Sequence, residues 1–420
     1  MITPSFSLTA TERVLPSMAL DFTSGALDSR VTFTRVGATA TVVDSAGYVV
    51  AAGVDVPRFD YDPVTLACKG LLIEESRSNL LTYSEDMFTG WNKSRLAVTT
   101  DYILGPDNTT SGNYLLCNAT SVNGMNVSKT SLTFSGSALT TSFFIKKGYD
   151  NYAVVILYDN ASNGVRQWFN VNTGAVASSN TFGTGWAKTN ATITPYPNGW
   201  YRCTLSVSTT GTTCALAIGP STPSDLGFGC TSGVTYGYLW GAQLEAGAFA
   251  TSYIPTTTAQ VTRTADVATM TGTNFSDWFN ASEGTFACHY DVIGLKAANG
   301  AWAVSDGTIQ NRMILRGNNT SSQVVSIGVV SNVTQWGIIN GGSHPLNTIN
   351  GVSVGYKVND IAMCDHGGGA ITDTSASIPT VNQFRIGADG DGSNPLCGHI
   401  QRLEYWPQRL TNNECRAFSK

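Results

Sequence analysis

Cysteine and histidine often serve in metal binding and nucleophilic catalysis, but this sequence spaces them poorly for either chemistry. No two of the four histidines have the His-x-x-x-His spacing that directs two imidazoles to one metal; they are His289, His344, His366 and His399. Cys364 and His366 lie two residues apart, but Gly367–Gly369 follows and indicates a surface loop rather than a nucleophile beside its base. The sequence therefore predicts neither a zinc site nor a catalytic Cys/His pair.

Two aspartates offer the hard oxygen ligands that calcium prefers. Asp389 and Asp391 alternate with glycines in the segment 387–395, which begins like a calcium-binding loop. An EF-hand would continue with glycine and glutamate where this chain has Asn394 and Ile400. Two interpretations stay open: an Asp-Gly turn, or a calcium ion held by both aspartates and backbone carbonyls at the rim of a β-sandwich. No other cofactor is predicted.

Glycoside hydrolysis requires two carboxylates across a cleft. Glu283 and Glu404 are lone glutamates in the last third of the chain. Glu74 and Glu75 are adjacent, so on an extended segment their side chains point to opposite faces. The sequence therefore predicts that the chain is not an enzyme.

Sugar recognition requires flat apolar side chains against the pyranose ring, and amide, carboxylate or guanidinium groups for its hydroxyls. Aromatic residues make up 10% of this chain. The candidates in its last third lie at or near expected strand ends: Trp302, Arg312, Arg316, Trp336, His344, Asp389, Asp391 and Asn394. For Trp302 and Trp336 the alternative is core packing, which we expect for Trp200, Trp240 and Trp406.

Composition restricts the class of protein further. A chain of 420 residues with 13% charged residues and abundant Gly, Ser, Thr and Asn is typical of two or three β-rich domains. The net charge is −5 and no Lys/Arg block is present, which disfavours nucleic-acid binding. No apolar run is long enough for a membrane span, and the first residues do not resemble a secretory leader. The nine widely spaced cysteines are expected to be buried free thiols, with a Cys203–Cys214 bridge as the alternative.

Short apolar segments bounded by Gly, Asn, Asp or Ser predict an all-β fold. In the middle of the chain the expected strands are 140–145, 152–158, 166–171, 200–207 and 236–244. In the last third they are 284–292, 312–316, 323–330, 351–358 and 382–387. A hairpin-like turn is expected at Asp44–Gly47, and Thr411 with Glu414 predicts a capping box that starts a short helix.

Three motifs carry a resemblance to a known group of proteins. They are PRFDYDP at 57–63, GLLIEESRSNLL at 70–81, and the segment 238–266, which contains GAQLEAG, SYIPT and VTRTAD. Together they resemble the signature of tail-fibre and other virion-attached proteins of tailed bacteriophages. The closing segment 397–419 resembles the last strand and short helix of concanavalin A-like (laminin G-type) jelly rolls.

The resemblance implies a domain organisation and a function. Residues 1–85 would form a small virion-attachment module, 86–258 a carbohydrate-binding-module-like sandwich, 259–269 a linker, and 270–420 a concanavalin A-like jelly roll. The protein would be a tail fibre, tail spike or head fibre, assembled in the bacterial cytoplasm. It would contact other virion proteins through its N-terminal module and bind host-surface polysaccharide as a homotrimer. Two rivals remain: a purely structural capsid-decoration or tail-connector protein, and a polysaccharide-degrading enzyme.

Overall fold

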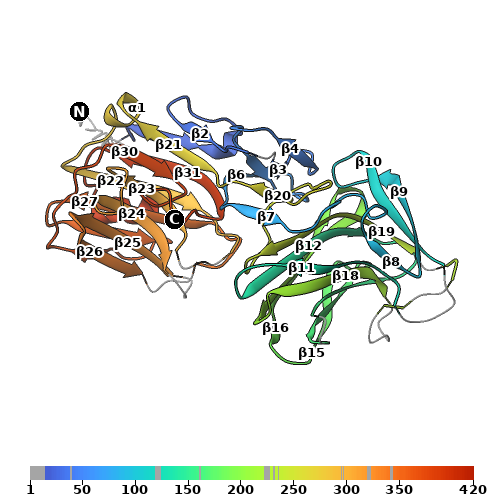
Figure 1. The fold of residues 1–420 in the computed structure, drawn as a ribbon. Helices are drawn as coiled ribbons and strands as arrows, with labels where there is room; N and C mark the ends of the chain where they lie inside the picture. The colour runs from blue at the N-terminus through green and yellow to red at the C-terminus, as the bar shows by residue number, and fades with distance from the viewer. Residues whose placement is uncertain are drawn as a thin grey trace, which may run out of the picture.

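The computed structural model describes residues 15–37, 40–118, 124–159, 162–221, 228–229, 232–234, 236–294, 296, 298–318, 323–340 and 344–420. Strands dominate this part of the chain, and the helices are two short α-helices, α1 (Thr273–Ser276) and α2 (Asn412–Phe418), and two 3-10 turns, η1 (Phe22–Ser24) and η2 (Pro197–Gly199). The predicted all-β fold with two β-sandwiches is confirmed. Figure 1 shows the sandwiches side by side, with the blue N-terminal strands running along one and reaching the other. No helix in these ranges is long and apolar enough to cross a membrane.

The middle sandwich contains two antiparallel sheets of six strands. One has the order β16 (Trp186–Tyr196), β17 (Trp200–Thr209), β12 (Ala138–Lys146), β19 (Tyr236–Ala246), β10 (Thr110–Cys117) and β9 (Leu96–Leu104). The other has the order β15 (Ala175–Phe182), β14 (Gly164–Asn170), β13 (Tyr152–Tyr158), β18 (Thr213–Ser221), β11 (Asn126–Thr133) and β8 (Asn92–Ser94). Alternate residues of β12, such as Phe143 and Ile145, fill the core, because successive strand residues point to opposite faces.

The outer face of the first of these sheets is divided into three parts. Phe144, Trp200 and Trp240 point away from the core but are buried, because Tyr253 of the following connector and Val49 pack over them. On one side of this covered strip lie the outward residues of β16 and β17, and on the other side those of β19, β10 and β9. The connector therefore leaves two separate parts of this face accessible.

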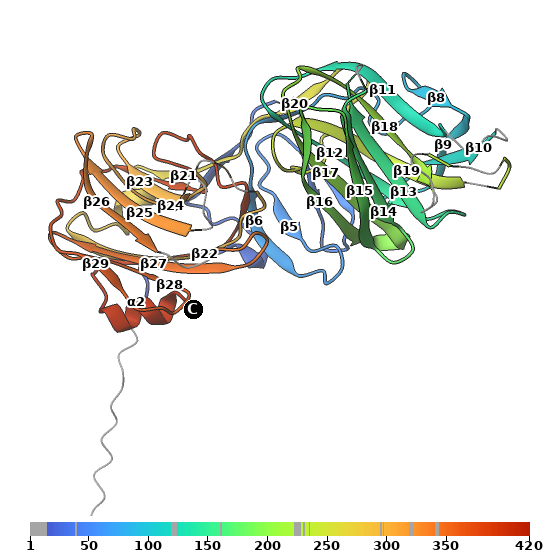
Figure 2. The ribbon, with the colours of Figure 1, turned by 90° about the horizontal axis from the view of Figure 1, so that it is seen from below.

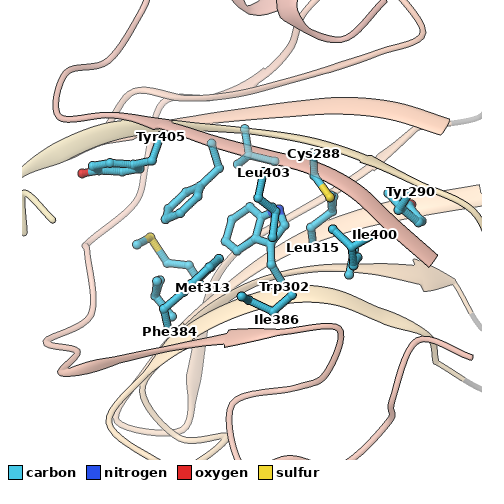
Figure 3. Close-up of a cluster of buried hydrophobic side chains, with 14 of the residues drawn as sticks. Cys288, Tyr290, Trp302, Met313, Leu315, Phe384, Ile386, Ile400, Leu403 and Tyr405 are labelled. Carbon is cyan, nitrogen blue, oxygen red and sulfur yellow. The ribbon is translucent and has the colours of Figure 1, made fainter. Parts of the chain in front are cut away.

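The distal sandwich follows in the chain. Its first sheet runs β29 (Ile371–Asp373), β28 (Ile361–Asp365), β27 (Asn350–Lys357), β22 (Glu283–Tyr290), β31 (Gly398–Trp406), β6 (Cys68–Ile73) and β5 (Phe59–Tyr61), and β1 (Met18–Asp21) also pairs with β31. Its second runs β2 (Thr32–Thr34), β21 (Val267–Thr271), β30 (Gln383–Ile386), β23 (Gly300–Ser305), β24 (Arg312–Asn318), β25 (Gln323–Val330) and β26 (Val333–Asn340). Figure 3 shows side chains from both sheets meeting in its core.

Apart from the hairpin of β3 (Ala40–Val43) and β4 (Val49–Ala52), the described N-terminal strands join sheets with strands from later in the chain, contrary to the predicted module 1–85. β1 pairs with β31, β2 with β21, and β6 with β31, so strands separated by more than 200 residues lie in the same sheets. Figure 2 shows β5 and β6 between the two sandwiches. Strands of three to six residues cannot bury enough surface alone, and they gain partners by extending an existing sheet.

The predicted linker 259–269 is also largely paired. β20 (Val261–Arg263) forms a two-stranded ribbon with β7 (Arg77–Asn79), and β21 enters the distal sheet at Val267. By contrast, the predicted turn at Asp44–Gly47 is confirmed. It joins β3 (Ala40–Val43) to β4 (Val49–Ala52), and the Gly47 amide donates to the Asp44 carbonyl at 2.9 Å.

Five buried charged residues, here called the junction network, hold these segments together: Arg35, Arg58, Glu74, Arg263 and Asp266. Their side chains are at most 1% exposed. Glu74 Oε2 lies 2.7 Å from Arg58 Nη1 and 2.8 Å from Arg263 Nη1. Asp266 pairs with Arg58 and, at 3.1 Å, with Arg35. Because Arg58, Glu74, Arg263 and Asp266 belong to the three motifs of the sequence signature, those motifs encode one buried structural site.

Ser252, from the SYIPT motif, connects the junction network to the connector that follows β19. Its amide and hydroxyl both donate to the Glu74 carboxylate at 2.7 Å, and its hydroxyl accepts from Arg58 at 2.7 Å. Nearby, the Thr41 hydroxyl donates to the Tyr253 carbonyl at 2.5 Å. The N-terminal segments, the connector and the distal sandwich are thus joined by one hydrogen-bonded cluster.

The cysteines are partly as expected. Cys203 and Cys214 are buried free thiols, so the alternative of a bridge between them is wrong. Cys117, however, is disulfide-bonded, which corrects the expectation that every cysteine is free. Cys230 lies outside the described residues.

The capping box predicted for the last helix is confirmed. Thr411 accepts from the Glu414 amide, and the Glu414 carboxylate accepts from the Thr411 amide at 2.7 Å. The helix then packs Cys415 against Trp406 and Cys364 on the outside of the distal sandwich.

Thr411→Ala should lower the free energy of unfolding by about 1 kcal/mol, because the helix loses its N-terminal acceptor. Chemical denaturation of both proteins measures the difference. Thr411→Ser keeps the hydroxyl and should preserve most of the stability. A Thr411→Ser variant as unstable as Thr411→Ala would contradict the capping explanation.

Candidate functional site

The two tryptophans predicted to bind sugar are core residues. Trp302 is 1% exposed, and its ring stacks on that of Phe286 with centroids 4.3 Å apart. Figure 3 shows Trp302 among the side chains of the distal core. Trp336 is 2% exposed, and its indole nitrogen donates to Ser326 Oγ at 3.2 Å. Neither ring presents a face to solvent, so this part of the predicted site is wrong. Both lie on strand positions that face the opposing sheet.

The predicted aspartate loop is stabilised by arginine. Asp389 is 1% exposed, and its Oδ1 accepts from Arg312 Nη1 at 2.7 Å and from the Gly390 amide at 2.6 Å. Asp391 is exposed and accepts from the Ser393 amide at 2.9 Å. Gly392, with φ 88°, closes the turn by donating to the Asp389 carbonyl at 2.9 Å. The geometry corresponds to an Asp-Gly turn, and the guanidinium already compensates the carboxylate that calcium would need.

The remaining predicted residues are divided between two places. Asn394 lies in the same turn, and its carbonyl accepts from the Gly300 amide at 2.9 Å, next to Arg316 on β24. Burial lowers the pKa of Arg316, while Asp389 acts in the opposite direction. His344 lies elsewhere, against Asp365. The structure therefore brings the arginines together with the aspartate turn, but not with the tryptophans or His344.

A different aromatic group is accessible on the middle sandwich. We call Tyr102, Tyr114, Tyr236 and Tyr238 the tyrosine platform. Tyr114 on β10 is the register partner of Tyr238 on β19, and its ring stacks on Tyr102 of β9 with centroids 4.7 Å apart. Tyr114 also lies 5.5 Å from Tyr236 and 5.7 Å from Tyr238. Tyr102 is 55% exposed and the other three are half-buried. Three adjacent strands thus present a continuous aromatic surface.

Polar groups accompany these rings. Lys146 is the register partner of Tyr238, and residues opposite each other in an antiparallel pair share a face. Burial, and secondarily the neighbouring tyrosines, raise the pKa of Tyr114 and Tyr238. The platform can therefore offer ring faces to a sugar's C–H groups, and hydroxyl and ammonium donors to its oxygens.

The sequence alone could have predicted part of the tyrosine platform. Tyr236 and Tyr238 alternate on one strand, which places both rings on the same face. The predicted sugar-binding residues all lie in the last third of the chain, so they do not include this pair. The contribution of Tyr102 and Tyr114 could not be anticipated, because it depends on the pairing of β9 with β10 and of β10 with β19.

The second accessible part of the same sheet lines a cleft between the sandwiches. This inter-sandwich cleft has a volume of about 490 Å³. On one side are outward residues of β16 and β17, among them Asn190, Thr192, Thr194, Arg202 and Thr204. On the other side are residues of the distal sandwich and its N-terminal strands, among them Asp60, Lys69 and Asp291. Its walls also carry the aromatic side chains of Tyr61, Phe144, Tyr196, Phe249 and Tyr253, so the cleft combines hydroxyl and charged groups with aromatic ones.

A buried histidine fixes the acidic wall of the inter-sandwich cleft. His399 is fully buried; its Nδ1 lies 2.8 Å from Asp291 Oδ1, and its Nε2 lies 3.0 Å from Asp60 Oδ2. Burial alone would lower the pKa of His399, but the two carboxylates outweigh it and raise the pKa above 6.5. Both ring nitrogens of His399 are thus engaged, and they hold the two carboxylates that line the cleft.

His399, Asp60 and Asp291, here called the charged triad, predict how the stability of the folded chain changes with pH. A raised histidine pKa stabilises the folded chain fully below the unfolded value of 6.5, and this contribution is lost as pH rises through the folded value. The pKa values of Asp60 and Asp291 are lowered despite burial, chiefly by His399, so their contribution is lost as pH falls below 3.8.

In the wild type, the free energy of unfolding should fall as pH rises above about 6.5, and His399→Gln should remove this slope. Denaturant titrations across neutral pH measure both. Lys69, which lies 3.4 Å from Asp60, is the other cation facing the triad, and Lys69→Gln should keep the slope. An identical slope in wild type and His399→Gln would contradict the assignment.

The fold and these surfaces define an all-β protein of two packed sandwiches with an exposed aromatic platform. No family model matches the chain, and no curated protein matches it. Among solved structures it is similar to the CBM40 of Ruminococcus gnavus IT-sialidase bound to α2,3-sialyllactose, with 14% identity and a TM-score of 0.30 over 34% of this chain and 84% of that one. It is also similar to the NanB sialidase from Streptococcus pneumoniae, with 11% identity and a TM-score of 0.30 over 36% of this chain and 26% of that one. A third similar structure is the heptameric SAP-like pentraxin from Limulus polyphemus, with 10% identity and a TM-score of 0.27 over 33% of this chain and 70% of that one.

Proposed function

We propose that this chain is a glycan-binding protein of a tailed-phage virion, which attaches the particle to polysaccharide on the host surface. The observation that carries the glycan-binding part is the tyrosine platform. Four tyrosines from three strands lie in contact on an accessible sheet face, whereas the large aromatic residues of the distal core are buried. Soluble proteins rarely expose contiguous aromatic surface without a partner.

The virion part of the proposal rests on the three motifs. PRFDYDP, GLLIEES and VTRTAD supply Arg58, Glu74, Arg263 and Asp266 to the junction network. A signature whose residues fix the relative position of two sandwiches suits a rigid attachment protein. Docking to other virion proteins through the N-terminal segment, and a trimeric assembly, are further parts of the proposal.

Binding by such a protein would be multivalent. A single shallow platform that contacts one or two sugar rings gives weak affinity, on the order of millimolar. Several copies on one particle convert later binding events into intramolecular ones, which raises the apparent affinity by about 10² to 10⁴. The proposed adhesion requires no bond cleavage.

A glycan array tests the proposal, with the full chain as the sample because β1, β5 and β6 complete the distal sheet. Retention on bacterial polysaccharides in multivalent display, and adsorption of the protein to host cells, are expected. A folded, assembled sample that binds no polysaccharide or cell would favour the purely structural alternative. New reducing ends after incubation with polysaccharide would favour the degrading enzyme instead.

A further inference from the structure

Three potential metal ligands from distant parts of the sequence meet at one end of the distal sandwich. Asp365 is the last residue of β28, and His366 follows it with φ 47°. His344 lies in the segment that follows β26. The ligand atoms of these three residues all lie within 4.8 Å of one another. They are the one such group of three or more His, Cys, Asp and Glu residues among the described residues.

The carboxylate at the centre of this group is buried without a permanent cation. The Asp365 side chain is 2% exposed. Its Oδ2 accepts from Asn340 Nδ2 at 3.0 Å and lies 2.9 Å from His344 Nε2. In the described part of the chain no Lys or Arg forms an ion pair with it. A buried carboxylate is costly unless a positive charge compensates it, and a bound divalent cation would do so.

Two atoms of the group have unused bonding capacity. His366 Nδ1 approaches Asp365 Oδ1 to 2.6 Å, yet Oδ1 makes no hydrogen bond. The second ring nitrogen of His344, Nδ1, is also buried without a partner, and the residue is 6% exposed. A metal ion here would engage Asp365 Oδ1, which hydrogen bonding leaves unsatisfied, and His344 through Nε2, the ring nitrogen that lies 2.9 Å from the carboxylate.

The donor set selects the class of metal. Two imidazole nitrogens and one carboxylate oxygen suit Zn²⁺, whereas calcium takes oxygen ligands alone. Zinc needs each donor at about 2.0–2.2 Å, so small side-chain rotations would gather the three atoms around one ion. His366 is 40% exposed, which leaves a solvent-facing fourth position for water.

We infer that His344, Asp365 and His366 form a zinc-binding site with three protein ligands and one exchangeable position. This corrects the interpretation of segment 364–369 as a plain surface loop and reassigns His344 from sugar binding. Local spacing could not indicate the site, because 21 residues separate His344 from Asp365 along the chain. The bound ion would join the end of β28 to the segment that follows β26.

Metal titration tests the site directly. The full chain, prepared without a histidine tag and stripped with a chelator, is titrated with Zn²⁺ in competition with a chromogenic chelator. We expect one equivalent to bind, and His366→Ala to weaken binding at least about tenfold. His344→Ala should act similarly, and the double variant should bind none. Because His366 is partly exposed, its variant should keep the wild-type circular dichroism spectrum.

Two measurements make the result decisive. His289→Ala is the matched control, since His289 lies on β22 with Nε2 2.9 Å from the Lys420 carbonyl and is not part of the group. It should retain the wild-type zinc affinity. Cobalt bound at the same site should give visible d–d absorption that His366→Ala removes. Absence of a zinc equivalent in the wild type, or unchanged affinity in the double variant, would overturn the inference.

Discussion

Glu74→Gln should lower the free energy of unfolding by about 3–5 kcal/mol, the cost of breaking a buried ion pair by removing one charge. Glu74 is the acceptor for Arg58 and Arg263, at 2.7 and 2.8 Å, and its side chain is 1% exposed. The substitution preserves shape and removes only the charge. It leaves three buried guanidiniums with Asp266 as the remaining carboxylate of the junction network.

The pKa values explain why this charge matters. Burial by itself would raise the pKa of Glu74, but Arg263 and Arg58 outweigh it and hold the pKa well below 4.5. For Arg58 burial would lower the pKa, and Asp266 with Glu74 raises it instead. Glu74 therefore stays charged although it is buried, because Arg263 and Arg58 lie beside it. The stability that Glu74 contributes is present above 4.5 and is lost as pH falls through its folded pKa.

Chemical denaturation of Glu74→Gln measures the effect, with Glu283→Gln as the control. Glu283 pairs with Lys357 at 3.5 Å, where the side chains are 32% and 54% exposed. An exposed pair of this kind contributes less than about 1 kcal/mol. Equal effects of the two substitutions would show that the junction network does not hold the sandwiches as described.

The second large effect concerns glycan binding. Tyr102→Ala and Tyr238→Ala should each lower the affinity for a bound polysaccharide about tenfold, and the double variant about a hundredfold or more. The ring centroid of Tyr102 lies 4.7 Å from that of Tyr114 and 6.4 Å from that of Tyr238. Tyr102 and Tyr238 therefore represent two of the three strands of the platform. Surface plasmon resonance on immobilised polysaccharide measures the loss. Tyr102→Phe separates ring stacking from hydroxyl bonding and should retain most of the affinity if stacking dominates.

Phe88→Ala is the matched control for this experiment. Phe88 is 56% exposed, close to the 55% of Tyr102, and it lies outside the platform. Its replacement should leave the affinity unchanged.

Sedimentation of the tyrosine variants tests whether the same surface is instead an interface between proteins. If the double variant bound polysaccharide normally but lost its oligomeric state, the platform would be a protein interface and the proposed glycan site would be wrong.

Local chemistry explains which expectations succeeded. The Asp44–Gly47 turn and the Thr411 capping box depend on groups a few residues apart, so the sequence around them suffices. Short apolar segments bounded by turn residues likewise identified strands such as β12 and β13. The site predictions failed where they depended on distant partners. Trp302 and Trp336 are aromatic residues near strand ends, and only the opposing sheet decides whether such a ring is buried.

The sequence by itself determined an all-β chain, because strand periodicity, turn residues and caps act over short distances. It also marked the segments 57–63, 70–81 and 238–266 through their resemblance to a known signature. Only the tertiary structure decided what these segments do. The charges of Arg58, Glu74, Arg263 and Asp266 lie up to 208 residues apart and compensate one another only once the sheets are formed. The same holds for the contribution of Tyr102 and Tyr114 to the tyrosine platform, which strand pairing creates, and for His344 with His366, which come together only when the distal sandwich folds.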